Sequence, residues 1–159
     1  MLPALGVIHM SLHTHHLQRT ADTLEQALAA LGKTDPADVV FWDLYRNAAI
    51  KSFELSLETA GKLLRRALKP YAGNPREVDA LVFNDVLRQA GRHTLLEAGE
   101  VSRWLAYRAN RNTTAHDYGE GFANETLKLL PAYLADLRQL ADRLQARFDA
   151  EARGPDAAA

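Results

Sequence analysis

Apolar residues recur at every third or fourth position along most of the chain, which is the spacing of one face of an α-helix. A first helix is predicted over residues 12–31. A second is predicted over residues 36–68, with Asp35 as its N-cap and Pro36 at its first position. The inner positions of these two helices are predicted to be Leu17, Leu24, Leu28, Leu31, Val40, Leu44, Ala48, Ala49, Phe53, Leu57, Ala60 and Leu64.

Three further helices follow from the same spacing. They are predicted over residues 75–90, from residue 100 to a break between Gly119 and Gly121, and over residues 122–152. Asn74 and Pro75 give the first of these a cap and a helix-compatible start. Its inward positions are predicted to be Val78, Leu81, Val82 and Val86. Five helices with short connections predict an all-α, antiparallel up-and-down bundle with a four-helix core.

The composition supports this fold class. Among 159 residues there are 27 Ala and 25 Leu but only nine Val and Ile together, which favours helices over a sheet. The length suits one domain, predicted over residues 12–152, with a flexible segment at 1–11 and a disordered tail at 153–159. No membrane-spanning segment is expected, because no apolar run approaches ~20 residues.

Two other counts limit the chemistry. The chain has no Cys, which excludes disulfides, thiolate metal sites and a cysteine nucleophile and fits a cytoplasmic protein. The net charge is −1, so a site for RNA or phosphate must be a local basic patch. His13 and His16 are separated by three positions, but no carboxylate lies near them, so no metal site is expected. No phosphate-binding glycine loop or other cofactor motif occurs, and no cofactor is expected.

The segment from Arg108 to Tyr118 concentrates the candidate chemistry. Arg111 can hold a phosphate through its planar, permanently charged guanidinium group, and His116 can transfer protons near neutral pH. Attack by a ribose 2′-hydroxyl on its own phosphodiester needs those two functions and does not require a metal. The same polar run also fits a helix end with a solvated face, so the spacing alone leaves both interpretations open.

Arg111 and His116 do not share a face on a straight helix, because five residues turn the chain by about 140°. They can meet if the helix bends, if the long arginine side chain wraps around, or if two subunits complete one another's site. Asn112 precedes His116 by four positions and is placed to orient its imidazole. On the second helix, Glu58 and Lys62 have the same spacing, which is typical of a surface ion pair.

The segment Arg111-Asn112-Thr113-Thr114-Ala115-His116-Asp117-Tyr118 resembles the R-N-x-T-x-H-x-Y form of the HEPN superfamily motif. This form is similar to that of HepT-like toxins and of nucleotidyltransferase substrate-binding proteins. Phe53, Glu54, Glu58 and Lys62 resemble the family's F-E-x3-E-x3-K helix, and Trp104 precedes Arg111 at the family's spacing. The resemblance covers about residues 48–148. Gly61 departs from it, since many relatives carry an aromatic residue there, and this position is expected to concern packing.

The resemblance implies a homodimer in which the motifs face one another across a cleft and act as a metal-independent endoribonuclease. Arg111 and His116 would be catalytic, with Asn112 in support and with Arg108, Glu58 and Lys62 as substrate-contacting residues. An MNT-type nucleotidyltransferase would serve as antitoxin, and Tyr118 would accept AMP from it in some systems. The alternative is a non-catalytic subunit that binds a nucleotide or another substrate for a separate nucleotidyltransferase. A third interpretation is a bundle whose role is only structural.

Overall fold

The computed structural model describes residues 5–114 and 120–154. In these two ranges it contains α-helices and one short 3-10 turn, with no strand, so the predicted all-α fold is confirmed. The elements are α1 (Leu5–Gly32), α2 (Val39–Leu68), η1 (Lys69–Tyr71), α3 (Pro75–Ala80), α4 (Phe83–Arg92), α5 (Ala98–Thr114) and α6 (Glu120–Arg153).

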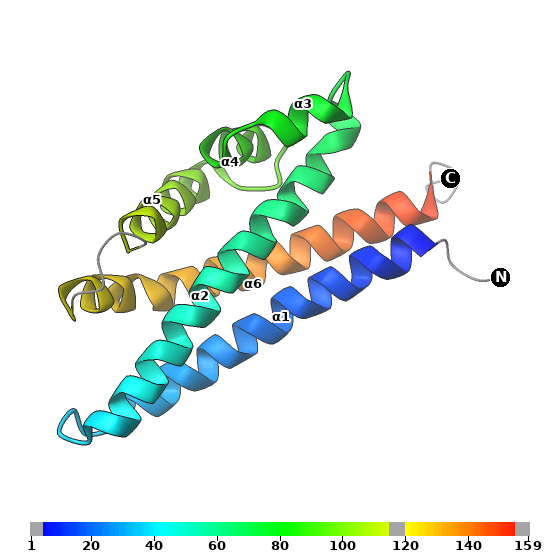
Figure 1. Cartoon of the computed structure of the whole chain (residues 1–159). Coiled ribbons are helices and arrows are strands. Elements are labelled where there is room, and N and C mark those ends of the chain that lie inside the picture. Colours follow the sequence, from blue (N-terminus) through cyan, green and yellow to red (C-terminus); the bar gives the residue numbers. More distant parts are fainter. Residues whose placement is uncertain (1–4, 115–119, 155–159) are drawn as a thin grey trace.

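The long helices run up and down (Figure 1). α1 and α2 form an antiparallel hairpin, and α6 packs against both of them. The short helices α3 and α4 lie at the end of α2, and α5 runs back from there toward the start of α6. α4 contacts both α2 and α5. α2 therefore has α1 and α6 packed along it and the α3–α5 segment near its C-terminal end.

The centre of the bundle is aromatic and aliphatic. Phe53, Trp104 and Tyr133 are its largest fully buried side chains, and buried leucines surround them. The predicted inner positions Leu57 and Leu64 are among these leucines. Burial of one such side chain contributes about 1.5–3 kcal/mol to folding, so this core is the main force that holds the helices together.

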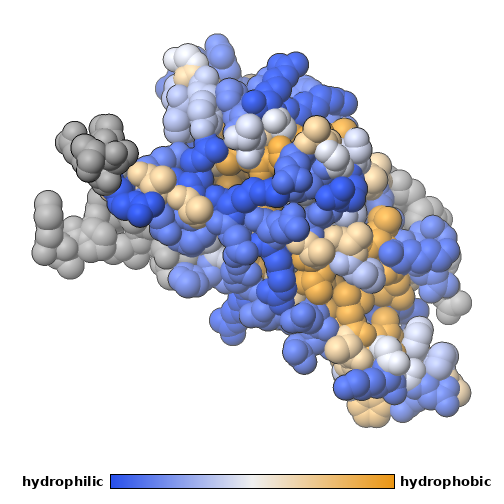
Figure 2. Space-filling view, turned by 180° about the vertical axis from the view of Figure 1, so that it is seen from behind, coloured by the Kyte–Doolittle hydropathy of each residue, from blue (hydrophilic) through white to orange (hydrophobic). Residues whose placement is uncertain are grey.

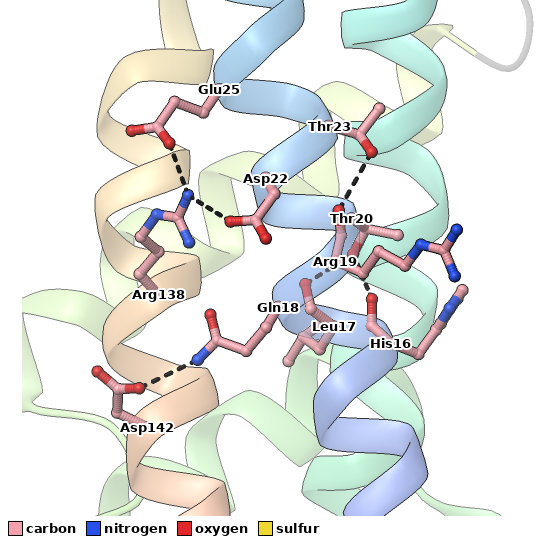
Figure 3. A network of polar contacts seen from close by, with 10 residues as sticks. All are labelled: His16, Leu17, Gln18, Arg19, Thr20, Asp22, Thr23, Glu25, Arg138 and Asp142. Carbon is pink, nitrogen blue, oxygen red and sulfur yellow. Dashed lines mark hydrogen bonds and ion pairs between the residues drawn. The ribbon is translucent and has the colours of Figure 1, made fainter.

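Polar contacts join α1 to α6 at the surface (Figure 3). The guanidinium group of Arg138 lies 3.0 Å from a carboxylate oxygen of Asp22 and 2.9 Å from one of Glu25. Gln18 donates a hydrogen bond to Asp142 at 3.0 Å. Pairs at such exposed positions contribute little each, so they align the two helices more than they stabilise them.

The start of α2 differs from the prediction. The helix begins at Val39, because Asp35 forms a turn instead: its carboxylate accepts from the Ala37 N–H at 2.9 Å and its carbonyl from the Asp38 N–H at 2.9 Å. The prediction that Val40 and Leu44 lie inward is wrong, since they are 75% and 57% exposed. No element of the described chain covers the face of α2 on which Val40 and Leu44 lie. Figure 2 shows apolar side chains at the surface toward the lower right, the end where α1 and α2 are joined.

The predicted third helix is two helices. The backbone is extended at Leu81 and Val82, which separates α3 from α4 and leaves Val82 exposed instead of inward. The Arg65 side chain explains the break, because its Nη1 donates to the carbonyls of Val78 and Leu81 at 2.9 and 2.7 Å. Carbonyls at a helix end need such partners, and here they come from α2.

The start of α3 agrees with the prediction, whereas the start of α1 does not. Asn74 caps α3 as predicted, since its side chain accepts from the Arg76 N–H at 3.1 Å. α1 begins at Leu5, earlier than the predicted start at residue 12, and so includes part of the predicted N-terminal segment. The tail predicted at 153–159 lies outside the described residues from position 155 onward. Among the described helices, none has the length and apolar character that crossing a bilayer would require.

Candidate functional site

An open cleft of about 460 Å³ lies between α2 and α5, with the start of α4 on one side. We call it the α2–α5 cleft. Charged side chains dominate its lining, which consists of Lys51, Glu54, Leu55, Leu57, Glu58, Gly61, Lys62, Arg65, Phe83, Arg108, Arg111 and Asn112. Its volume is in the range of small-molecule sites, about 300–1,000 Å³.

Helical spacing places these side chains on facing walls. On α5, Arg111 and Asn112 follow Arg108 by three and four positions, so the three side chains lie on one side of the helix and reach the cleft together. Across from them, Lys51, Glu58 and Lys62 project from one face of α2 for the same reason. The two walls come from segments about fifty residues apart in the chain, and folding brings them together.

The electrostatics of the cleft are unbalanced. Among the residues that the structure describes, five basic side chains but only two carboxylates line it. Nη1 of Arg111 lies 3.7 Å from Oε1 of Glu54, and Nζ of Lys51 lies 3.8 Å from Oε2 of the same carboxylate. Nζ of Lys62 lies 3.4 Å from Glu58. These pairs are long and partly exposed, so an incoming phosphate can compete with the carboxylates for the cations.

Phe83 forms the floor beneath Arg108. The Arg108 guanidinium carbon lies 4.7 Å from the centre of the Phe83 ring, a cation–π contact. The ring rests against Gly61, where a Cβ atom would come closer than 3.0 Å to Cε2. Gly61 was expected to affect packing, and it does: the missing side chain makes room for an aromatic ring from α4.

Buried contacts hold α5 in place behind the cleft. The rings of Trp104, Tyr107 and Tyr133 meet edge to face with centres 5.1–5.7 Å apart. Asp136 of α6 accepts hydrogen bonds from Arg103 at 2.8 and 2.9 Å and from the Tyr107 hydroxyl at 2.7 Å. Since α5 is locked to α6 in this way, the side chains of Arg108 and Arg111 start from a fixed backbone.

The same contacts set the ionisation of the network. Burial disfavours the Asp136 carboxylate, but the hydrogen bonds from Arg103 and Tyr107 outweigh this effect and hold its pKa below the usual value. Burial and the bond to Asp136 raise the pKa of Tyr107. The ion pair therefore persists at neutral pH, and Tyr107 stays protonated as its donor.

Five of the predicted site residues meet in this cleft: Glu58, Lys62, Arg108, Arg111 and Asn112. His116 and Tyr118 lie outside the described residues. Sequence reasoning overlooked Lys51, although it shares a face of α2 with Glu58, seven positions later. The hydrogen bonds of Arg65 to two backbone carbonyls depend on the tertiary structure, so no local sequence pattern could have shown them.

Comparison with known proteins shows which proteins this chain resembles. The family model described as "Nucleotidyltransferase substrate binding protein like" matches residues 12–146. The "Probable ribonuclease HepT" of Haemophilus influenzae is 30% identical over 128 residues, which cover 79% of this chain and 86% of that protein.

A solved Haemophilus influenzae structure is also similar, with a TM-score of 0.73 and 28% identity. The match covers 83% of this chain and 98% of that one. That structure is described as revealing the fold of a substrate-binding domain of a nucleotidyltransferase. The similarity therefore extends over most of the bundle and includes both walls of the α2–α5 cleft.

Proposed function

This chain belongs to the HepT-like family of nucleotidyltransferase substrate-binding proteins, and from that premise we propose that it is a metal-independent endoribonuclease. In this proposal it acts in the cytoplasm as the toxin of a toxin–antitoxin pair. The observation that carries the proposal is the α2–α5 cleft, in which Arg108 and Arg111 lie within a local excess of positive charge. A scissile phosphate needs such charge in the transition state.

The proposed reaction is attack by a ribose 2′-oxygen on the adjacent phosphorus. The bond from phosphorus to the 2′-oxygen forms and the bond to the 5′-oxygen breaks, which leaves a 2′,3′-cyclic phosphate and a 5′-hydroxyl. One proton leaves the 2′-hydroxyl and one is delivered to the 5′-oxygen. Arg111 stabilises the charge on phosphorus, and the motif implies that His116 transfers protons with support from Asn112.

The α2 surface supports a homodimer. Val40, Leu44, Leu55, Glu58 and Lys62 fall within an arc of about 60° on α2 at ~100° per residue, and the first three of them are exposed and apolar. The uncovered apolar surface therefore continues along the helix face that leads into the cleft. A second copy that packed on this surface would bring its own motif to the cleft and so complete a shared site.

The proposed antitoxin is a small nucleotidyltransferase of the MNT type. It would transfer AMP from ATP to Tyr118: a bond forms between the tyrosine oxygen and the α-phosphorus, and pyrophosphate leaves. The added phosphate would introduce negative charge beside a basic cleft and repel RNA. Mass spectrometry of the chain coexpressed with an MNT-type nucleotidyltransferase is expected to show this addition, and a Tyr118→Phe variant would lack it.

A second candidate function is a non-catalytic subunit that binds a nucleotide for a separate nucleotidyltransferase. The specific observation in its favour is the size of the cleft, which lies in the range of a small-molecule site. This candidate requires saturable nucleotide binding and no cleavage of any RNA.

The deciding experiment is RNA cleavage by the purified chain in EDTA. We expect the wild type to release 2′,3′-cyclic phosphate ends, and Arg111→Ala and His116→Ala to lose most of this activity while keeping the same thermal unfolding temperature. His15→Ala, which changes an exposed histidine on α1 away from the cleft, is the matched control and should remain active. Activity that His116→Ala retains, or that appears only with added metal, would contradict the proposed mechanism.

A further inference from the structure

A second basic hollow lies farther along α2, between α1 and α3. Its volume is about 470 Å³. Its lining includes His16 of α1, Arg66 of α2, Lys69 of η1 and Asp79 of α3. Figure 3 shows His16 on the side of α1 opposite to the network around Arg138. We call this the α1–α2 hollow. It borders the α2–α5 cleft, because Lys62 and Arg65 line both.

The cations of this hollow differ in how firmly the protein already holds them. Arg65 is engaged by two backbone carbonyls and is part of the structure. Nζ of Lys69 lies 3.2 Å from Asp79, but both side chains are partly exposed, so this pair is weak. Arg66 is exposed and forms no ion pair within the described residues. Lys69 and Arg66 therefore remain accessible to an anion from solution.

We propose that Lys62, Arg66 and Lys69 bind the phosphate backbone of single-stranded RNA as it leaves the α2–α5 cleft. This inference rests on the proposed function and specifies its substrate as a strand several nucleotides long. Each hollow alone has the size of a site for one small molecule, but the two share a basic ridge on α2. A row of exposed cations that joins two hollows suits a polyanion, since it can neutralise successive phosphates.

The length of the basic row agrees with a strand. From Lys51 to Lys69 the helix rises by about 27 Å at 1.5 Å per residue. Successive phosphates of a stacked strand advance by about 3.4 Å, so a strand of roughly eight nucleotides spans the distance from Lys51 in the cleft to Lys69 in the α1–α2 hollow. A mononucleotide would leave most of these cations without a partner. Of the described residues that line the cleft and the hollow, only Glu54, Glu58 and Asp79 are acidic.

The test compares a long and a short RNA on the intact chain. The probes are fluorescein-labelled 2′-O-methyl oligouridines of about 12 and about three nucleotides, whose blocked 2′-oxygens prevent cleavage. Fluorescence anisotropy at salt concentrations between about 50 and 200 mM gives the affinity and its salt slope. The variant is Arg66→Ala with Lys69→Ala. The matched control is Lys33→Ala with Arg153→Ala, which removes the same charge from exposed positions that line neither hollow.

We expect the Arg66/Lys69 variant to bind the long probe about 25-fold more weakly at ~0.1 M salt. Each phosphate contact contributes about 0.7 to the slope of log affinity against log salt concentration, so the loss of two contacts predicts this change. The short probe should bind equally to the variant and the wild type, and the control should match the wild type with both probes. Equal affinity of the wild type for long and short probes, or an equal loss in the control, would overturn the inference.

The outcome is separable from that of the proposed function. If RNA is cleaved in EDTA but the Arg66/Lys69 variant binds the long probe normally, the backbone site is refuted and the ribonuclease proposal stands. If no RNA is cleaved but the Arg66/Lys69 variant binds the long probe more weakly as expected, the strand-binding site stands and the catalytic proposal fails.

Discussion

The contact between Gly61 and Phe83 allows a quantitative prediction for Gly61→Ala. An alanine Cβ would lie 3.2 Å from both Cδ2 and Cζ of the Phe83 ring and closer than 3.0 Å to Cε2. Since carbon atoms pack at about 3.5–4.0 Å, the ring must move by roughly 1 Å. Such overpacking costs about 1–3 kcal/mol, whereas replacing glycine inside a helix gains about 1 kcal/mol. The expected net effect is a loss of about 1 kcal/mol.

Urea unfolding of two variants in two backgrounds measures this balance. In the wild-type background Gly61→Ala should lower the free energy of unfolding by about 1 kcal/mol. In a Phe83→Leu background the same substitution should be neutral or stabilising by up to ~1 kcal/mol, because the smaller side chain leaves room for the methyl group. Gly32→Ala is the control, since nothing lies within 4 Å of that position at the end of α1.

The sign of the coupling decides the outcome. If Gly61→Ala stabilises the wild type as much as the Phe83→Leu protein, the ring does not fill the space above Gly61 and the reasoning is refuted. The substitution should also affect function, because the displaced Phe83 ring makes the cation–π contact with Arg108. We expect weaker binding of RNA by Gly61→Ala.

Three further predictions follow from named contacts. Asp136→Asn should lower the free energy of unfolding by about 1–3 kcal/mol at neutral pH, as the charged acceptor of Arg103 and Tyr107 is lost. The folded-state pKa of Asp136 is depressed, so its carboxylate stabilises the fold above about pH 3.9. This stabilisation is lost as the pH falls through the pKa of the folded state. The free energy of unfolding of the Asp136→Asn variant, measured between about pH 7 and 3, should lack this pH-dependent contribution. Asn74→Ala should cost about 1 kcal/mol in thermal unfolding through loss of the α3 cap, and Asn74→Asp should not. Arg111→Ala should reduce RNA cleavage about 10²–10³-fold, and Arg111→Lys should recover only part of it, because an ammonium group lacks the planar fork; full recovery would show that charge alone suffices.

The helices of the bundle could be predicted from the sequence where burial and periodicity agree. Phe53, Leu57 and Leu64 lie inside as their spacing predicts. Val40 and Leu44 have the same spacing but are exposed, because periodicity finds an apolar face without saying what covers it. The break between α3 and α4 was not predictable either, since it depends on a side chain of α2 that bonds their connection.

The candidate site divides in the same way. Arg108, Arg111 and Asn112 are neighbours in the chain, so a local motif was enough to single them out. Lys51 lines the same cleft only because α2 lies opposite α5, and no local sequence pattern shows that these two helices are close. Phe83 is the first residue of α4, and its contact beneath Arg108 depends on Gly61, twenty-two residues earlier.

The distribution of ion pairs separates the structural charges from those available to a ligand. Arg103, Arg138 and Arg143 each contact carboxylates on a neighbouring helix at 3.0 Å or less, and the Asp136 and Glu100 carboxylates in these pairs are buried. Such pairs join α5 and α1 to α6. In the α2–α5 cleft the pairs are longer, and the cations outnumber the acids.

The chain as a whole carries a net charge of −1, so this excess is local and is balanced by acids elsewhere. Folding does not need a cluster of like charges, because repulsion between them destabilises the folded state. Their retention on facing walls of one cleft is explained if an anion binds between them. Stability should therefore rise when RNA or another polyanion is added to the protein and fall back as salt screens the interaction, and an unchanged unfolding temperature in saturating RNA at low salt would contradict this explanation.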